Sequence, residues 1–131
     1  MTDRDLLNKA RDAAKNAYAP YSRFQVGAAI ECGNGEVFTG CNVENAALGG
    51  TICAERCAAL KAISEGNRDF RRIAIWADSR EYCTPCGTCR QFLMEFAKDM
   101  EILSARGDGR YKCYKLEALL PEAFNGAVIE A

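Results

Sequence analysis

The stretch RRIAIWAD, residues 71–78, decides the fold that we predict for this chain. It is largely apolar, as a buried strand is, and helical patterns flank it at residues 53–65 and 86–99. Gly66 supplies a stop for the first of these helices. A further strand-like segment follows at residues 101–105. The order of strand, helix and strand predicts a βαβ crossover, in which the two strands run parallel.

Upstream of this unit the sequence predicts a helix and a β-hairpin. Thr2 and Asp5 resemble a capping box at the start of the helix, which we expect to end before Pro20. Residues 24–32 and 36–42 are strand-like, and they flank a Gly-Asn-Gly sequence that is typical of a hairpin turn.

Downstream of the crossover, residues 110–115 predict a last strand and residues 116–120 a short helix. The complete order is therefore α-β-β-α-β-α-β-β-α. A hairpin joined to a βαβ unit predicts an α/β fold, a three-layer α/β/α sandwich in which a five-stranded mixed sheet carries helices on both faces. A chain of 131 residues is long enough for one core but short for two, so we expect a single domain over residues 1–131.

The charge balance excludes some classes of partner. With 17 basic and 18 acidic residues the formal net charge is −1, so there is no strong basic field to hold a nucleic-acid backbone. The first residues are charged and lack an apolar region, and the sequence contains no run of about 18 apolar residues. We therefore expect a soluble, cytoplasmic protein that binds neither nucleic acid nor membrane.

Eight cysteines and the absence of histidine are the most informative part of the composition. In a cytosolic chain, cysteines indicate metal ligands and buried thiols rather than disulfides. TICAERC, residues 51–57, contains Cys-x-Glu at one expected helix start, and TPCGTCRQ, residues 84–91, contains Pro-Cys-x-x-Cys at another. Together they form the signature of the zinc deaminases, with cysteine in place of histidine as the first ligand. The candidate zinc ligands are Cys53, Cys86 and Cys89.

Helix geometry limits how these residues can cooperate. Side chains two residues apart in a regular helix point about 200° apart. Cys53 and Glu55 can therefore converge only if Cys53 lies in the frayed first turn of its helix. Arg56 and Cys57 follow Cys53 at helical spacing and are its neighbours on the same face.

Two other kinds of site stay open at this point. Adding Cys57 to the three candidate ligands would make a closed structural zinc site without room for water. Cys83, Cys86 and Cys89 have the spacing of three ligands of a ferredoxin cluster, although the sequence has no cysteine at the fourth position. The simplest assignment makes Cys57 a helix-core thiol and Cys83 a loop thiol near the site. The remaining thiols are most simply small hydrophobic residues: Cys32, Cys41 and Cys113.

Beyond the two cysteine motifs, the sequence resembles the small homotetrameric cytidine deaminases over nearly its whole length. The matching segments are AYAPYSRFQVGAAI (residues 17–30), GCNVENAA (40–47), CAER (53–56), PCGTCRQ (85–91) and LLPEAF (119–124). The resemblance implies one Zn²⁺ per chain on Cys53, Cys86 and Cys89, with water as the fourth ligand. It also implies that Glu55 takes a proton from that water, protonates N3 of cytosine and later serves the leaving amine.

The same resemblance implies a substrate site. Asn42 and Glu44 match the pair that binds the ribose, and Phe24 matches the aromatic residue that packs on the pyrimidine. Ala54 belongs to the same substrate-binding set. Phe124 matches an aromatic residue that reaches the site of a neighbouring subunit.

Arg56 and Leu48 are two further positions that bear on the site. Zn²⁺ with three thiolates carries a formal charge of −1, and we expect Arg56 and two helix N-termini to withdraw charge from the sulfurs. Leu48 stands where relatives usually carry an aromatic residue near the sugar of an adjoining subunit.

We therefore predict a homotetrameric, zinc-dependent deaminase of cytidine and 2′-deoxycytidine that serves pyrimidine salvage. One alternative is a deaminase of a modified cytosine nucleoside, which Leu48 would admit. The other is a non-catalytic structural-zinc or iron–sulfur protein.

Overall fold

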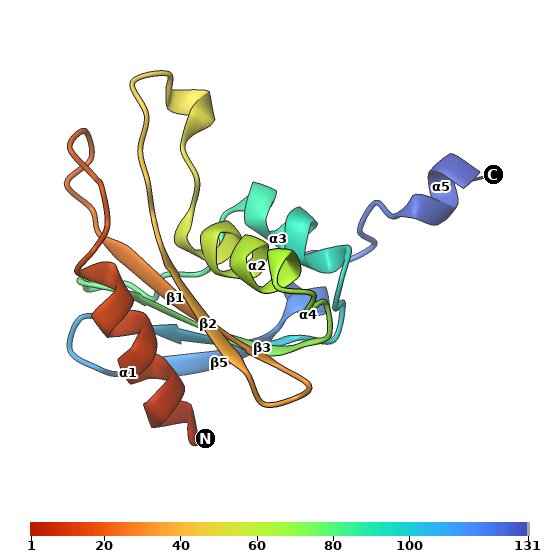
Figure 1. Cartoon of the computed structure of the whole chain (residues 1–131), viewed down its shortest axis with the longest axis horizontal. Coiled ribbons are helices and arrows are strands. Elements are labelled where there is room, and N and C mark those ends of the chain that lie inside the picture. Colours follow the sequence, from red (N-terminus) through yellow and green to blue (C-terminus); the bar gives the residue numbers. More distant parts are fainter. Residues whose placement is uncertain (131) are drawn as a thin grey trace.

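Figure 1 shows the computed structural model of the chain, in which residues 1–130 are described. The strands are β1 (Val26–Cys32), β2 (Val37–Cys41), β3 (Phe70–Ala77), β4 (Glu101–Ala105) and β5 (Tyr111–Lys115). They form one sheet with the order β2-β1-β3-β4-β5. β3 and β4 run parallel and the other neighbouring strands run antiparallel, so the sheet is mixed, as predicted.

Helices cover both faces of this sheet. α1 (Asp3–Ala14) lies on one face, and α2 (Ala54–Ser64) and α3 (Gly87–Met94) lie on the other (Figure 1). On the α1 side, Leu6 and Leu7 pack on apolar residues of β1, β3 and β4. A larger apolar core lies between the sheet and the pair of α2 and α3. The predicted three-layer α/β/α sandwich is confirmed.

Two glycines allow helices to approach the sheet closely. Gly27 on β1 faces α1, and a Cβ atom there would lie 1.8 Å from the carbonyl oxygen of Ala10. Gly40 on β2 faces α2, and a Cβ atom there would lie 2.4 Å from the backbone nitrogen of Ala58. Both positions therefore require a residue without a side chain. The contact at Gly40 sets the distance between α2 and this edge of the sheet.

The residues at which the helices begin and end agree only in part with those predicted from the sequence. α1 begins with the predicted capping box, in which the Thr2 hydroxyl accepts from the Asp5 N–H at 3.1 Å and the Asp5 carboxylate accepts from the Thr2 N–H at 3.0 Å. α3 ends at Met94, well before the predicted residue 99. The N–H groups of Phe96 and Ala97 both donate to one carbonyl at the end of α3, which turns the chain toward β4.

Three short helices complete the described chain. α4 (Leu116–Leu119) lies where a short helix was predicted. The 3₁₀ helix η1 (Leu48–Gly50) and the terminal α5 (Gly126–Glu130) were not predicted. Figure 1 shows α5 projecting away from the sheet, at the end of the C-terminal segment. Within residues 1–130, every helix lacks the length and apolarity of a membrane span.

Candidate active site

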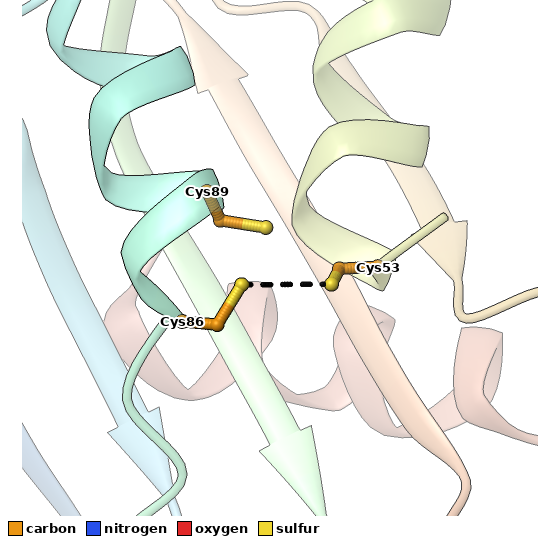
Figure 2. Close-up of side chains that lie close together, drawn as sticks. All are labelled: Cys53, Cys86 and Cys89. Atoms are coloured by element: carbon orange, nitrogen blue, oxygen red, sulfur yellow. Dashed lines mark hydrogen bonds between the residues drawn. The ribbon is translucent and has the colours of Figure 1, made fainter. Parts of the chain in front are cut away.

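The N-termini of α2 and α3 meet on the same face of the sheet. Cys53 is the N-cap of α2 and Cys86 the N-cap of α3, both with extended backbone at ψ of 155° and 168°. Cys89 lies in the first turn of α3. Figure 2 shows the three side chains facing one another across the gap between the helices. Their Sγ atoms all lie within 4.8 Å of one another, and those of Cys53 and Cys86 are 3.7 Å apart. We refer to these three cysteines as the sulfur triad.

The sulfur triad fits a zinc ion. Zn–S bonds of about 2.3 Å in a tetrahedral site place two sulfurs about 3.8 Å apart, which agrees with the 3.7 Å between Cys53 and Cys86. Arg56 lies beside the triad, where Nη2 donates to the Cys53 sulfur at 3.7 Å and to the Thr51 carbonyl at 3.1 Å. The Nε atom of Arg56 is buried and has no hydrogen-bond partner within residues 1–130. Three sulfurs make a donor set that leaves the fourth position of a tetrahedral zinc ion open, and Arg56 can interact with one of these sulfurs.

The electrostatics of the triad favour a thiolate at Cys53. Contact with the Cys89 thiol, and then with Arg56, lowers the pKa of Cys53 to about 5, although burial opposes this change. The pKa of Cys89 is raised, because its thiol is hydrogen-bonded to Cys53 and is buried. Arg56 therefore occupies the position expected from its spacing, next to an anionic sulfur.

Glu55 lies beside the triad in the first turn of α2. Cys53 is the N-cap of α2 and not a helical residue. The side chains of Cys53 and Glu55 are therefore not forced to opposite sides of the helix, so they meet the condition for convergence that followed from their spacing in the sequence. Glu55 is only 4% exposed, and burial raises the pKa of its carboxyl to about 7. Such a group can both accept and donate a proton near neutral pH.

Two further cysteines near the motifs lie outside the triad within the described residues. Cys57 faces β2, where its Cβ atom would lie 2.9 Å from a Cβ atom placed on Gly40. Cys83 is partly buried against the apolar core, and this burial raises the pKa of its thiol to about 11. The closed four-thiolate site needs Cys57 and the iron–sulfur site needs Cys83, so neither matches the observed group of sulfurs.

A cavity of about 230 Å³ opens next to the triad. Four of the predicted substrate-binding residues line it together with Glu55: Phe24, Asn42, Glu44 and Ala54. Phe124 does not line it, and its ring lies on the C-terminal segment, where the residue is 55% exposed. The Phe124 carbonyl accepts a hydrogen bond from the Gln91 side chain at 2.9 Å. The lining also contains residues that were not assigned to the site from the sequence: Ser22, Val26, Thr51, Cys83 and Thr84.

Hydrogen bonds fix Asn42 and Glu44, which follow β2 in the chain and line this cavity. Asn42 uses both ends of its amide, since Nδ2 donates to the Phe24 carbonyl at 2.8 Å and Oδ1 accepts the first N–H of β1 at 2.9 Å. Glu44 accepts from the N–H groups of Tyr21 and Ser22, and from the Ser22 hydroxyl. These donors, the hydroxyl first, lower the pKa of Glu44, so this residue is a carboxylate at neutral pH.

Known proteins match this chain in both sequence and structure. A family model, described as the cytidine and deoxycytidylate deaminase zinc-binding region, matches residues 1–104. The cytidine deaminase of Halalkalibacterium halodurans is 46% identical over 120 residues, which cover 91% of each chain. The probable cytidine deaminase of Dictyostelium discoideum is 44% identical over 124 residues, which cover 91% of this chain and 84% of that one.

A solved structure gives the same result. The crystal structure of cytidine deaminase from Burkholderia pseudomallei aligns with a TM-score of 0.92 at 42% sequence identity, over 95% of this chain and 100% of that one. The matched region contains the whole sulfur triad, and its family is defined by zinc binding. Zinc is therefore the cofactor, and the chain belongs to the cytidine and deoxycytidylate deaminase family.

Proposed function

We propose that this chain catalyses the zinc-dependent hydrolysis of cytidine and 2′-deoxycytidine to uridine and 2′-deoxyuridine, with release of ammonia. The observation that carries the proposal is the place of Glu55, a buried carboxyl beside three convergent sulfurs at the wall of one cavity. An aromatic ring, an amide and a carboxylate line the same cavity. The names of the relatives, which are cytidine deaminases, support the same reaction.

Cys53, Cys86 and Cys89 would hold the zinc ion. When bound, the ion supplies the Lewis acidity that makes water a nucleophile near neutral pH. Arg56 donates a hydrogen bond to the Cys53 sulfur. This bond draws negative charge away from the sulfur and so keeps the site electrophilic.

Glu55 moves the protons in this proposal. Its carboxylate accepts a proton from the attacking water and donates it to N3 of the cytosine ring, which makes C4 electrophilic while the water oxygen bonds to C4. A second proton passes from that oxygen, by the same carboxyl, to the amino group. The C4–N4 bond then breaks, so that one water is consumed and one ammonia is released. A pKa of about 7 for Glu55 suits a carboxyl group that must both accept and donate a proton near neutral pH.

The lining of the cavity suits an uncharged nucleoside. Phe24 offers a ring to the pyrimidine, Ala54 offers a small wall beside it, and the side chains of Asn42 and Glu44 offer hydrogen-bonding groups to the sugar. Within the described part of the chain, lysine and arginine are missing from this lining. Because Glu44 is anionic, a phosphate on the sugar would meet repulsion without a compensating cation.

Replacement of Glu55 tests the proposed reaction. Glu55→Gln keeps the shape of the side chain, so we expect one zinc per chain and a kcat for cytidine that falls by about 10²–10⁴-fold. Elemental analysis gives the zinc content, and the loss of ultraviolet absorbance gives the rate. Cys89→Ser is the matched control, which should lose both metal and activity. A Glu55→Gln protein that lacks zinc, or that turns over as the parent does, would contradict the assignment.

We further propose a cytoplasmic homotetramer that serves pyrimidine salvage, as the resemblance implies. Leu48 is 72% exposed and Phe124 is 55% exposed, so both side chains are accessible to a neighbouring subunit. In the tetramer these two residues would reach the sites of neighbouring subunits. Sedimentation of the active enzyme at assay concentration tests this assembly, and a fully active monomer would contradict it.

A deaminase of a modified cytosine nucleoside is the second candidate. It is favoured by Leu48, which stands where relatives usually carry an aromatic residue. Rates for a panel of cytosine nucleosides that differ in the base and in the 5′ substituent of the sugar separate the two candidates. A modified nucleoside with a kcat/KM well above those of cytidine and 2′-deoxycytidine would favour the second.

A further inference from the structure

The Glu44 carboxylate accepts three hydrogen bonds from the loop of residues 19–25, which borders the cavity. Glu44 Oε1 accepts from the backbone N–H groups of Tyr21 and Ser22, at 2.9 and 3.0 Å. The Ser22 hydroxyl donates to Oε2 of the same carboxylate and accepts from the Phe24 N–H at 3.0 Å. The Ser22 side chain is therefore bonded both to the acid that faces the sugar and to the backbone of the residue that faces the base.

The backbone of this loop is constrained as well. Arg23, between Ser22 and Phe24, has a φ of 59°, in the left-handed region that residues other than glycine rarely adopt. The Arg23 N–H donates to the Ala19 carbonyl at 3.0 Å, which closes the turn. Within this turn the Ser22 hydroxyl accepts the hydrogen bond from the Phe24 N–H at 3.0 Å.

The hydrogen bonds leave the Glu44 carboxylate little spare capacity. An ionised carboxylate has about four lone-pair sites, and three donors from the loop occupy three of them. One lone pair is left to accept a hydroxyl of the substrate. The terminal torsion of a glutamate is otherwise broad. The two N–H groups bind Oε1, and the Ser22 hydroxyl is the donor from this loop that binds Oε2, so it contributes to the direction of that lone pair.

We propose that Ser22 is a positioning residue for sugar recognition. Its hydroxyl orients the Glu44 carboxylate toward one sugar hydroxyl and holds the Phe24 backbone beside the base. The inference rests on the proposed function, in which Glu44 binds the sugar and Phe24 the pyrimidine.

Ser22→Ala removes both hydrogen bonds of the hydroxyl and tests the inference. We expect KM for cytidine to rise about tenfold while kcat changes by less than about twofold, because the lost bond acts on binding and not on the proton transfers. Ser22→Thr keeps a hydroxyl and should recover most of the affinity. Ser22→Cys keeps a side chain of similar volume but has a weaker hydrogen-bond donor, so its KM should lie between those of Ser22→Ala and Ser22→Thr. This variant also provides a test if Ser22→Ala folds poorly.

Ser79→Ala is the matched control. The Ser79 hydroxyl accepts from the Glu81 N–H at 3.0 Å, the same contact over two residues that Ser22 makes with Phe24. Ser79 does not line the cavity and bonds no carboxylate of the site. We expect parent values of KM and kcat.

A double-mutant cycle with Glu44→Gln separates positioning from a general effect on the loop. If Ser22 acts through Glu44, Ser22→Ala should change KM much less in the Glu44→Gln background than in the parent. Substrates that lack one sugar hydroxyl give a second readout. With one lone pair available on Glu44, the effect of Ser22→Ala should vanish for either 2′-deoxycytidine or 3′-deoxycytidine, but not for both.

The outcomes distinguish this inference from the function on which it rests. If Glu44→Gln raises KM but Ser22→Ala has the parent KM, the role of Ser22 is wrong and that of Glu44 stands. If Glu44→Gln itself has the parent KM, the sugar-binding role of Glu44 is wrong and the inference falls with it. A Ser22→Ala effect that persists in full with Glu44→Gln would show that Ser22 acts on the loop alone, and this too overturns the inference.

Discussion

Replacement of Gly40 by alanine should damage the active site by displacing the backbone of α2, although Gly40 itself does not line the cavity. A Cβ atom at this position would lie 2.4 Å from the Ala58 nitrogen and 2.7 Å from the Ala54 carbonyl oxygen. Both atoms belong to the backbone of α2, so no side chain can rotate to make room. Ordinary contacts begin at 3.4 Å, and α2 must therefore move away from β2 by about 1 Å.

The shift has two consequences of different size. Overpacking of this kind destabilises a folded protein by about 1–3 kcal/mol. A movement of α2 by about 1 Å also displaces Cys53 and Glu55 relative to the two cysteines of α3, and misplacement on this scale can lower a rate by about 10²-fold. We therefore expect kcat/KM for cytidine to fall by about 10²-fold, and zinc to pass more quickly to a chelator.

Urea unfolding, cytidine turnover and zinc release to a chelator should be measured on the same samples. Gly27→Ala is the informative comparison, because its Cβ atom would lie 1.8 Å from the Ala10 carbonyl on the opposite face of the sheet. It should destabilise the fold at least as much, yet its folded fraction should keep a kcat near that of the parent, since α1 carries none of the proposed site residues. Gly126→Ala, with no atom of the described chain within 4 Å of its Cβ position, should match the parent throughout.

A Gly40→Ala protein with the rate and the zinc release of the parent would refute this reasoning, because it would show that the contact does not position α2. An equal loss of kcat in Gly27→Ala would refute it in another way, by indicating a general loosening of the fold.

Other substitutions test the surroundings of the metal. Cys57→Ser should keep one zinc per chain and most of the activity, since Cys57 faces β2 and lies outside the triad; loss of the metal in elemental analysis would favour the four-thiolate site instead. Arg56→Gln should bind zinc but turn over more slowly, with its pH–rate profile shifted to higher pH, because a less positive site acidifies water less. Adding Cys53→His should recover part of that loss, and an unchanged profile for Arg56→Gln would leave the arginine a structural role only. Arg90→Met removes hydrogen bonds of 2.7 and 2.8 Å to backbone carbonyls before α3 and at the end of α4. Urea unfolding should show a free energy of unfolding lower by about 3 kcal/mol. An unfolding midpoint equal to that of the parent would show that water replaces these bonds at no cost.

The parts of the fold and site that depend on local pattern could be predicted from the sequence. The apolar run at residues 71–78 is β3, and the Gly-Asn-Gly turn joins β1 to β2. The spacing of Cys53 and Glu55 predicted that the cysteine must lie at the helix start, and it is the N-cap. These features follow from side-chain periodicity and helix capping, which involve neighbours in the chain.

Features that depend on contacts between distant segments could not be predicted. Ser22 stands in a segment quoted for its resemblance, yet its partner Glu44 is 22 residues away and no local pattern reports the bond. Residues 95–99 were expected to continue α3, and most of them are compatible with a helix. The chain turns there because Met100 is buried at the entrance to β4, so tertiary packing overrides the local preference. Val128 and Ile129 of α5 are exposed, so this helix lacks the buried apolar stripe by which a helix is recognised in a sequence.

The position of the sulfur triad also affects how the polypeptide is held together. Cys53 and Cys86 are 33 residues apart, and β3, the central strand of the sheet, lies between them in the chain. In the proposed site, zinc at the triad would be a cross-link that closes a loop through the middle of the sheet, as a disulfide does in secreted proteins. The chain-entropy model gives a cross-link of this span a stabilising effect of about 4 kcal/mol, which is a large share of the about 5–15 kcal/mol that separates folded from unfolded domains. We therefore expect a chain that loses its metal to unfold more readily, so that zinc would contribute to the stability of the fold as well as to turnover.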